Sequence, residues 1–201
     1  RTAAPVSCDA DLNDWPLEGG FSSLTAEPYG EDHHLEAYLM LDDEHLYLAA
    51  FVGDPTPMRN SVDVQFDADI ADKGGSIRVG LARAGGDPIR ATLWYQPSDR
   101  KALLRINDTM AETYEGQFRA FANGRGYMVE YAIPWATLGL SAPGSGETMG
   151  MTWEVNWSDE GGRQWRGRLS DLITPEAAAR LKKTPFRPMN EPDAWGKAHI
   201  E

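Results

Sequence analysis

The 201-residue sequence has little cysteine, few cations and no long apolar run, and each shortage argues against a class of protein. Its one cysteine, Cys8, cannot form an intrachain disulfide. Lys and Arg total 19 against 31 Asp and Glu, and the net charge of −12 argues against nucleic acid or an anionic membrane as a partner. No apolar stretch approaches the ~18 residues of a membrane span, so we expect no membrane insertion. The acidic balance suits a neutral partner such as a sugar, a divalent cation, or simple solubility.

Catalytic motifs are also missing. The sequence has no Gly-x-Ser-x-Gly elbow, no His-Glu-x-x-His pair and no phosphate-binding loop of the Walker type. Paired carboxylates could serve glycoside hydrolysis, but among 31 acidic residues some pair will be close by chance. We therefore expect a protein that is not itself an enzyme, although it could be one module of a larger carbohydrate-active enzyme.

What the sequence has in quantity is period-two alternation of apolar and polar residues, which is typical of strands. The predicted strands are 35–41, 46–52, 62–66, 77–81, 89–95, 117–122, 127–133, 152–157 and 163–169. Polar or glycine-containing turns at 42–45, 85–88, 123–124 and 160–162 join them as hairpins. This spacing predicts an all-β protein: an antiparallel β-sandwich of jelly-roll or immunoglobulin-like type, formed by a single domain over 1–201. Thr174-Pro175-Glu176 starts one short C-terminal helix, predicted over 175–183.

Several separated phrases occur in a fixed order along the chain. They are Asp9-Ala-Asp-Leu-Asn-Asp-Trp15, Leu41-Asp-Asp-Glu-His-Leu-Tyr-Leu-Ala-Ala50, Ser61-Val-Asp-Val-Gln-Phe-Asp-Ala-Asp69, Gly126-Tyr-Met-Val-Glu-Tyr-Ala-Ile-Pro-Trp135 and Leu138-Gly139-Leu140. Together they resemble the family 9 carbohydrate-binding modules and the wider DOMON-like group of β-sandwich ligand binders, from Asp9 to Ile200. The resemblance implies sugar binding for most members and haem binding for a minority.

Strand phase sorts the residues that could contact a ligand. Opposite the apolar phase lie Gln65, Arg90, Trp94, Glu130, Glu154 and Asn156, which would share one outer face if these strands share a sheet. An exposed indole can stack on the C–H face of a sugar, while planar polar groups bond its hydroxyls. The predicted ligand residues are Trp94, Trp157, Trp165, Arg90, Gln65, Glu154 and Asn156. Glu130 has the alternative of a sheet-surface charge paired with a neighbour such as Arg166.

The other tryptophans are predicted to pack in the core. Trp15, Trp135 and Trp195 lie in the phrases that carry the resemblance, and Trp153 shares its phase with Val155. Trp157 and Trp165 flank the turn at 160–162 and could reach the rim of a site, whereas Trp94 has only polar neighbours in phase.

Two cofactors come into question. Asp67, Asp69 and Asp72, followed by Gly74-Gly75, offer hard oxygen ligands and are predicted to bind a structural calcium; the alternative is an acidic loop that ends a strand. Haem would need an axial methionine with lysine or histidine, and no recognisable pair is present. The methionines and histidines available are Met58, Met128, Met149, Met151, His33, His34, His45 and His199.

The leading hypothesis is a secreted, periplasmic or surface protein that binds a saccharide or polysaccharide without catalysis. The alternatives are a haem-binding electron-transfer domain of the same fold and a structural or interaction sandwich without a ligand. Because the sequence starts at Arg1 without Met, we expect either a removed signal peptide or a piece of a larger protein.

Overall fold

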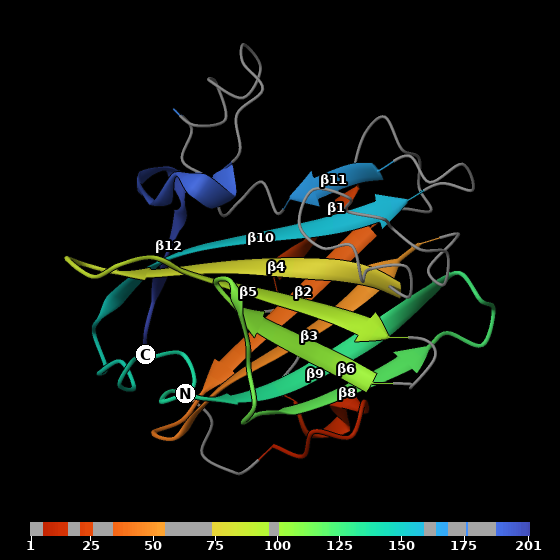
Figure 1. The fold of residues 1–201 in the computed structure, drawn as a ribbon, viewed down its shortest axis with the longest axis horizontal. Helices are drawn as coiled ribbons and strands as arrows, with labels where there is room; N and C mark the ends of the chain where they lie inside the picture. The colour runs from red at the N-terminus through yellow and green to blue at the C-terminus, as the bar shows by residue number, and fades with distance from the viewer. Residues whose placement is uncertain are drawn as a thin grey trace.

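The alternating runs form strands that pair into two antiparallel sheets, stacked as two layers whose strands cross (Figure 1). The computed structural model describes residues 6–15, 21–25, 34–54, 74–96, 101–158, 164–168, 176 and 188–201. Within these, side chains are described except at 21–25, 74–75, 95–96, 156–158, 164–168 and 188. The predicted all-β antiparallel sandwich is confirmed.

The five-stranded sheet has the order β1-β2-β3-β9-β8. Its strands are β1 (Phe21–Thr25), β2 (His34–Leu41), β3 (His45–Gly53), β9 (Gly126–Pro134) and β8 (Glu115–Ala120). The seven-stranded sheet has the order β11-β10-β4-β5-β6-β7, and β12 also pairs with β10. Its strands are β11 (Gln164–Arg168), β10 (Thr148–Ser158), β4 (Gly74–Arg83), β5 (Ile89–Gln96), β6 (Lys101–Ile106), β7 (Thr109–Met110) and β12 (Gly196–His199).

The main core lies between the inner faces of the two sheets. It contains the apolar phase of β3, β4 and β9, including Leu48, Val79 and Tyr131, each at most 1% exposed. Each fully buried aliphatic or aromatic side chain contributes roughly 1.5–3 kcal/mol relative to exposure. Trp135 and Trp153 are buried in this core, as predicted.

The described helices are short 3-10 turns: η1 (Leu12–Asp14), η4 (Pro188–Asn190) and η5 (Pro192–Ala194). Of the helix predicted over 175–183, the structure describes only Glu176, which is helical. The predicted strand 62–66 lies outside the described residues, and strands β1, β6, β7 and β12 were not predicted. No helix in the described part of the chain has the length and apolar character to cross a membrane.

The outer face of the five-stranded sheet is covered by residues 6–15, which we call the N-terminal cap. Trp15 and Leu12 pack there against Tyr38, Tyr47 and Met128 as a second apolar cluster. Because this cluster buries the sheet on its second side, the five-stranded sheet has apolar contacts on both faces.

Glu130 fastens this cap. Its Oε1 accepts a hydrogen bond from Trp15 Nε1 at 2.7 Å, and its Oε2 accepts from the backbone N–H groups of Asp9 at 2.9 Å and Ala10 at 2.8 Å. The prediction that Glu130 lies on the same outer face as Trp94 and Glu154 is wrong, as is the alternative of a surface charge. Its strand, β9, belongs to the five-stranded sheet, and the residue is 1% exposed.

The β2–β3 hairpin is held by Asp42. Asp42 Oδ1 accepts hydrogen bonds from the backbone of Glu44 and His45, and the indole of Trp135 donates to the Asp42 carbonyl at 3.0 Å. Burial disfavours the ionised side chain, but hydrogen bonds from Tyr47, His45 and Glu44 keep the pKa of Asp42 below its usual value. The phrases 41–50 and 126–135, which are far apart in the sequence, therefore contact each other at this hairpin.

The C-terminal residues 188–195 cover one end of the outer face of the seven-stranded sheet. Trp195 is fully buried there, against Gly80 of β4. A Cβ atom on Gly80 would lie 2.7 Å from Trp195 Cη2, so only glycine admits the indole at this distance. Further along this outer face lie the described side chains of Arg78, Thr92, Arg105 and Glu154, together with Trp94.

Candidate functional site

Four adjacent strands of the seven-stranded sheet bring polar side chains into one row across its outer face. In the register, Glu154 of β10 lies opposite Arg78 of β4, Arg78 opposite Thr92 of β5, and Thr92 opposite Arg105 of β6. Arg168 of β11 is the backbone partner of Glu154 on the other side. We call Glu154, Arg78, Thr92 and Arg105 the arginine row. Directly opposed residues of neighbouring strands lie on the same face, so strand pairing alone assembles the row.

An ion pair lies at the centre of the arginine row. Arg78 Nη1 lies 3.2 Å from Glu154 Oε1, and Glu154 is 1% exposed. Such a pair is weak evidence for a stabilising role, because removing both charges from water offsets much of their attraction. It does fix a planar guanidinium and a carboxylate in a set orientation, and both are groups that can bond paired hydroxyls or an anion.

Trp94 lies next to the row, on the outer face where its strand phase predicts it. Its indole is nevertheless only 7% exposed, so the expectation of an exposed tryptophan at this position is wrong. One reason is Arg105, whose guanidinium carbon lies 5.6 Å from the centre of the indole ring. This cation–π contact covers a ring face that a sugar would need for stacking.

Tyr131 ties the strands that carry Trp94 and Arg105 to the opposite sheet. Its hydroxyl donates to the carbonyl oxygens of Leu103 at 2.9 Å and Trp94 at 3.3 Å. Burial raises the pKa of Tyr131 well above its usual value, so the hydroxyl remains a donor at physiological pH. Through these bonds the core residue Tyr131 holds the backbones of β5 and β6 beneath the outer face.

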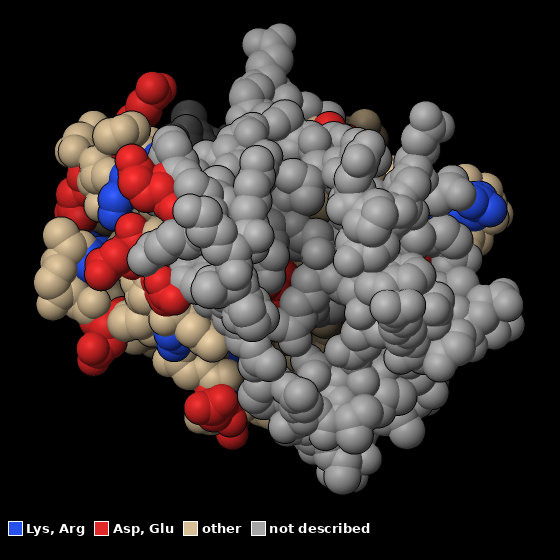
Figure 2. Space-filling view, turned by 90° about the horizontal axis from the view of Figure 1, so that it is seen from above, with Lys and Arg blue, Asp and Glu red and all other residues tan. Residues whose placement is uncertain are grey.

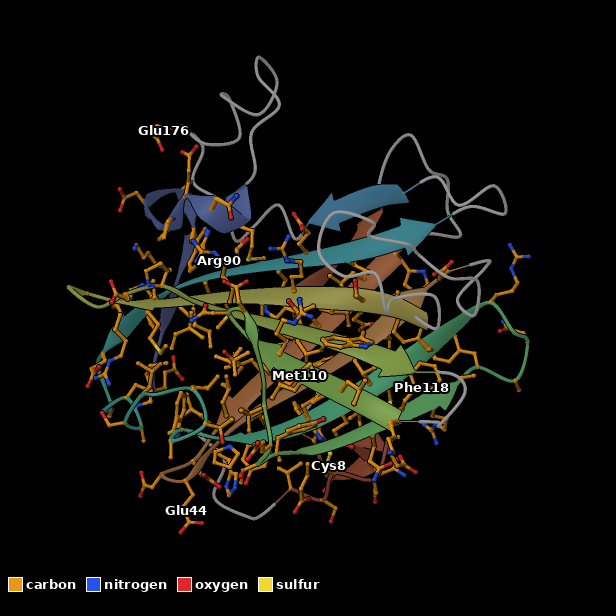
Figure 3. All side chains as sticks on the ribbon, viewed as in Figure 1. Cys8, Glu44, Arg90, Met110, Phe118 and Glu176 are labelled. Carbon is orange, nitrogen blue, oxygen red and sulfur yellow. The ribbon has the colours of Figure 1, made fainter. Side chains whose placement is uncertain are left out.

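Arg90 lies on the same outer face but is bound to the C-terminal segment. Its Nε donates to the Met189 carbonyl at 2.8 Å, and its backbone N–H donates to Asn107 Oδ1 at 3.0 Å. Figure 3 shows Arg90 beside the C-terminal 3-10 turns, away from Cys8 of the N-terminal cap. Arg90 therefore borders the arginine row and anchors the segment that covers one end of the face.

The other predicted ligand residues are described in part or not at all. The backbone register pairs Trp157 with Trp165, and Asn156 with both Ser76 and Arg166. The structure does not describe the side chains of Trp157, Trp165 and Asn156. Gln65 and the predicted calcium ligands Asp67, Asp69 and Asp72 lie outside the described residues.

Comparison with solved structures places the fold. No protein-family model matches the sequence, and no curated protein is similar to it. A family 9 carbohydrate-binding module from Caldicellulosiruptor kristjanssonii in complex with cellotriose superimposes with a TM-score of 0.65, over 98% of this chain and 90% of that one, at 16% identity. A second structure of such a module from the same organism, in complex with glucose, gives a TM-score of 0.56 over 87% of this chain and 80% of that one, at 17% identity. This chain has a CBM9-like fold.

In this CBM9-like sandwich, several residues of the arginine row were not among the predicted ligand residues. Arg78 could have been found from its phase between Ile77 and Val79, and Thr92 from its phase between Arg90 and Trp94. Arg105 could not, because its strand was not predicted. None of the four charged or hydroxyl side chains of the row has a neighbour in the row that is close in sequence, so only the strand pairing joins them.

The methionines considered as haem ligands lie in apolar surroundings wherever the CBM9-like sandwich describes them. Met128 packs under the N-terminal cap, and Met149 and Met151 lie in the main core. Across the described residues, no three His, Cys, Asp or Glu side chains gather as metal ligands would. Calcium binding therefore stays a prediction of the sequence, and haem binding stays the alternative that the sequence disfavours.

Proposed function

We propose that this chain is a non-catalytic carbohydrate-binding domain whose saccharide lies on the outer face of the seven-stranded sheet, against the arginine row. The observation that carries the proposal is the ion pair of partly exposed Arg78 with buried Glu154 at the centre of this face in a CBM9-like fold. A saccharide presents paired hydroxyls, which a fixed guanidinium and carboxylate can bond in two directions. Such a ligand would place the protein outside the cytoplasm, in the periplasm, at the cell surface or in the medium.

The test is isothermal titration with cello-oligosaccharides, first with the wild type and then with the double variant Arg78→Met/Glu154→Met. Replacing both charges by apolar groups of similar length removes the pair as a unit, so neither of its two charges is left facing an apolar side chain, and the fold should survive. Loss of hydrogen bonds to charged groups, worth roughly 1.5–3 kcal/mol each, should weaken binding about tenfold or more.

The chain offers a matched control in a second arginine–glutamate pair. Arg83, at the end of β4, pairs with Glu147, which lies just before β10 and away from the arginine row. Arg83→Met/Glu147→Met should keep wild-type affinity. Equal affinity in both double variants, or no binding of any saccharide by the wild type at millimolar concentration, would refute the proposal.

Calcium is a separate proposal that rests on the sequence of Asp67, Asp69 and Asp72. A cation bound only to the folded state raises the melting temperature by mass action. We expect a chelator to lower the melting temperature of the wild type and to leave that of the triple Asp→Asn variant unchanged. An unchanged wild-type melting temperature, together with no metal by elemental analysis, would contradict calcium binding.

A further inference from the structure

The turn between β8 and β9 contains the step Asn123-Gly124, and asparagine is followed by glycine only here in the sequence. Residues 122–125 are all exposed, and Gly124 has a φ of 69°, in the left-handed region that glycine adopts without strain. Figure 1 shows the turn projecting beyond the ends of the strands, and at the same end of the molecule Figure 2 shows described atoms, basic ones among them, at the surface. Solvent therefore reaches both residues of this step.

An asparagine that precedes glycine can lose its side-chain amide without an enzyme. The backbone nitrogen of Gly124 gives its proton to water or hydroxide and attacks Cγ of Asn123. An N–Cγ bond forms, the Cγ–Nδ2 bond breaks, and ammonia leaves after taking up a proton. Water then opens the cyclic imide at either of its two C–N bonds. Breaking the N–Cγ bond gives aspartate at position 123, whereas breaking the other gives isoaspartate, in which the chain continues through Cγ.

The turn holds the carbonyl group that this reaction attacks. Asn123 Oδ1 accepts a hydrogen bond from the backbone N–H of Arg125 at 2.9 Å. This oxygen becomes negatively charged when Cγ is attacked, and an N–H group already directed at it stabilises the new charge, as in an oxyanion hole. Gly124 also has no Cβ to hinder its own nitrogen. Among the described residues beyond its chain neighbours, no atom lies within 4 Å of the place of that Cβ.

One hydrogen bond restrains the reaction. The N–H of Gly124 donates to the Phe121 carbonyl at 2.9 Å, so the nitrogen must leave this partner before it attacks. Bonds in an exposed turn open locally, at far lower cost than global unfolding. The next bond, from the Phe121 N–H to the Gly126 carbonyl at 2.9 Å, closes the hairpin and stays in place. The reaction can therefore start from the folded protein.

We propose that Asn123 is a site of spontaneous deamidation in the folded protein, and that isoaspartate there loosens the β8–β9 hairpin. Isoaspartate lengthens the main chain of the turn by one carbon atom. The strand beside the turn leaves little room for it, because a Cβ on Gly126 would lie 2.3 Å from the Val52 carbonyl oxygen and 2.7 Å from the ring of Phe121. Aspartate at position 123 only adds a negative charge to a chain of net charge −12. The inference concerns the five-stranded sheet and is independent of saccharide binding.

The experiment is peptide mapping by mass spectrometry after incubation of the folded protein at mildly alkaline pH. Asn107 is an internal control: it also lies on an exposed turn, and its Oδ1 accepts the backbone N–H of Arg90 at 3.0 Å, but Asp108 follows it. We expect conversion of amide to acid at Asn123 and a rate at Asn107 at least ~10-fold lower, equivalent to about 1.4 kcal/mol in activation free energy. Equal rates at the two sites, or no conversion at Asn123, would overturn the proposal.

Two further measurements test the reactant and the effect on the hairpin. Gly124→Asp gives Asn123 the same following residue as Asn107, and aspartate tolerates the left-handed conformation, so the turn should form while deamidation falls to the rate at Asn107. Urea below the unfolding transition should leave the wild-type rate unchanged; a rate that follows the unfolded fraction would contradict reaction in the folded protein.

Hydrogen exchange then compares the isoaspartate form, isolated by anion exchange, with the variant Asn123→Asp, which has the same added charge and a normal backbone. The amides of β8 should exchange faster in the isoaspartate form, because its longer turn disturbs the pairing with β9. Equal exchange in the two proteins would refute the loosening of the hairpin.

Discussion

The outer faces of the two sheets differ in what covers them. The face of the five-stranded sheet is apolar and is sealed by the protein's own N-terminal cap, with Trp15 and Leu12 packed on Tyr38 and Tyr47. The face of the seven-stranded sheet has Trp195 at one end and the arginine row beside it. One face is thus completed by the chain itself, and the other offers fixed polar groups.

Each face has a buried glutamate, and the partners of the two glutamates explain the difference. Glu130 receives three N–H donors that all come from the cap, so its charge is used within the protein. Glu154 pairs with Arg78, a side chain that can itself bond a ligand. The donors to Glu130 all belong to the protein's own cap, which indicates a structural role, whereas Glu154 is bonded by Arg78 of the outer face.

The largest effect on stability should come from removing the packing between the N-terminal cap and the five-stranded sheet. Trp15→Ala removes a buried indole and should lower the free energy of unfolding by about 3–5 kcal/mol. Urea denaturation followed by circular dichroism measures it. Trp15→Phe keeps most of the packing but loses the hydrogen bond to Glu130, and should fall between the two. A loss below ~1 kcal/mol for Trp15→Ala would mean that the cap adds little.

The next largest loss of stability is expected for Glu130→Gln. One amide nitrogen must now face N–H donors, so we expect a loss of ~1–3 kcal/mol in the free energy of unfolding. Burial raises the pKa of Glu130 above its ordinary value of 4.5, and hydrogen bonds from Trp15, Ala10 and Asp9 only partly oppose this. A raised pKa in the folded state means that the contribution of this group to stability is full below pH 4.5 and is lost as pH rises through the folded-state pKa.

The free energy of unfolding of the wild type should therefore exceed that of Glu130→Gln most at low pH. The difference between the two should shrink as the pH rises toward neutrality. Parallel denaturation curves of the two proteins at several pH values measure that difference, since all other groups titrate alike in both. A difference that grows with pH would contradict the assignment of burial as the dominant influence on Glu130.

Gly80→Ala tests the covered end of the seven-stranded sheet. The added methyl group would meet Trp195 at 2.7 Å, and overpacking of this kind costs roughly 1–3 kcal/mol. Gly150→Ala is the matched control, since its Cβ would lie 3.5 Å from the nearest atom, an ordinary contact distance. Thermal unfolding of both variants should show a drop for Gly80→Ala alone. Similar melting temperatures would mean that Trp195 can move aside.

The smallest effect is expected at the exposed edge of the five-stranded sheet. Arg119→Ala, on β8, should change the free energy of unfolding by less than ~0.5 kcal/mol, because the side chain is exposed. It should also leave saccharide binding unchanged. A substantial loss of either property would show that β8 takes part in more than the edge of its sheet.

Much of this fold could be predicted from local patterns, because alternation alone determines which residues of a strand share a face. The inward phase of Leu46 to Val52, of Ile77 to Leu81 and of Tyr127 to Ile133 was predicted and is confirmed. Alternation cannot tell which strands share a sheet, since pairing depends on contacts distant in sequence. For this reason Glu130 was assigned to the wrong face.

The phrases that made the chain recognisable belong largely to the scaffold. Asp9 and Trp15 meet Glu130, and Asp42 meets Trp135, so these residues bond one another across the chain. The arginine row has no such phrase, because its members come from four different strands, β10, β4, β5 and β6. Its composition was accessible only once the register was known, and the cover over Trp94 could not be inferred from phase.

The order of the strands also has a consequence for how the protein is made. A ribosome releases the chain from its N-terminus, and all described strands of the five-stranded sheet lie within 21–134. That sheet and its cap are therefore available for folding before β10, the strand that joins β4 to β11 and β12, has been synthesised. Until then the opposing sheet consists of β4 to β7 without β10, β11 and β12, and the apolar surface left exposed is prone to aggregation. We expect the arrival of β10 to be the step that commits the nascent chain to its native state, and long-range strand pairing to make that step slow.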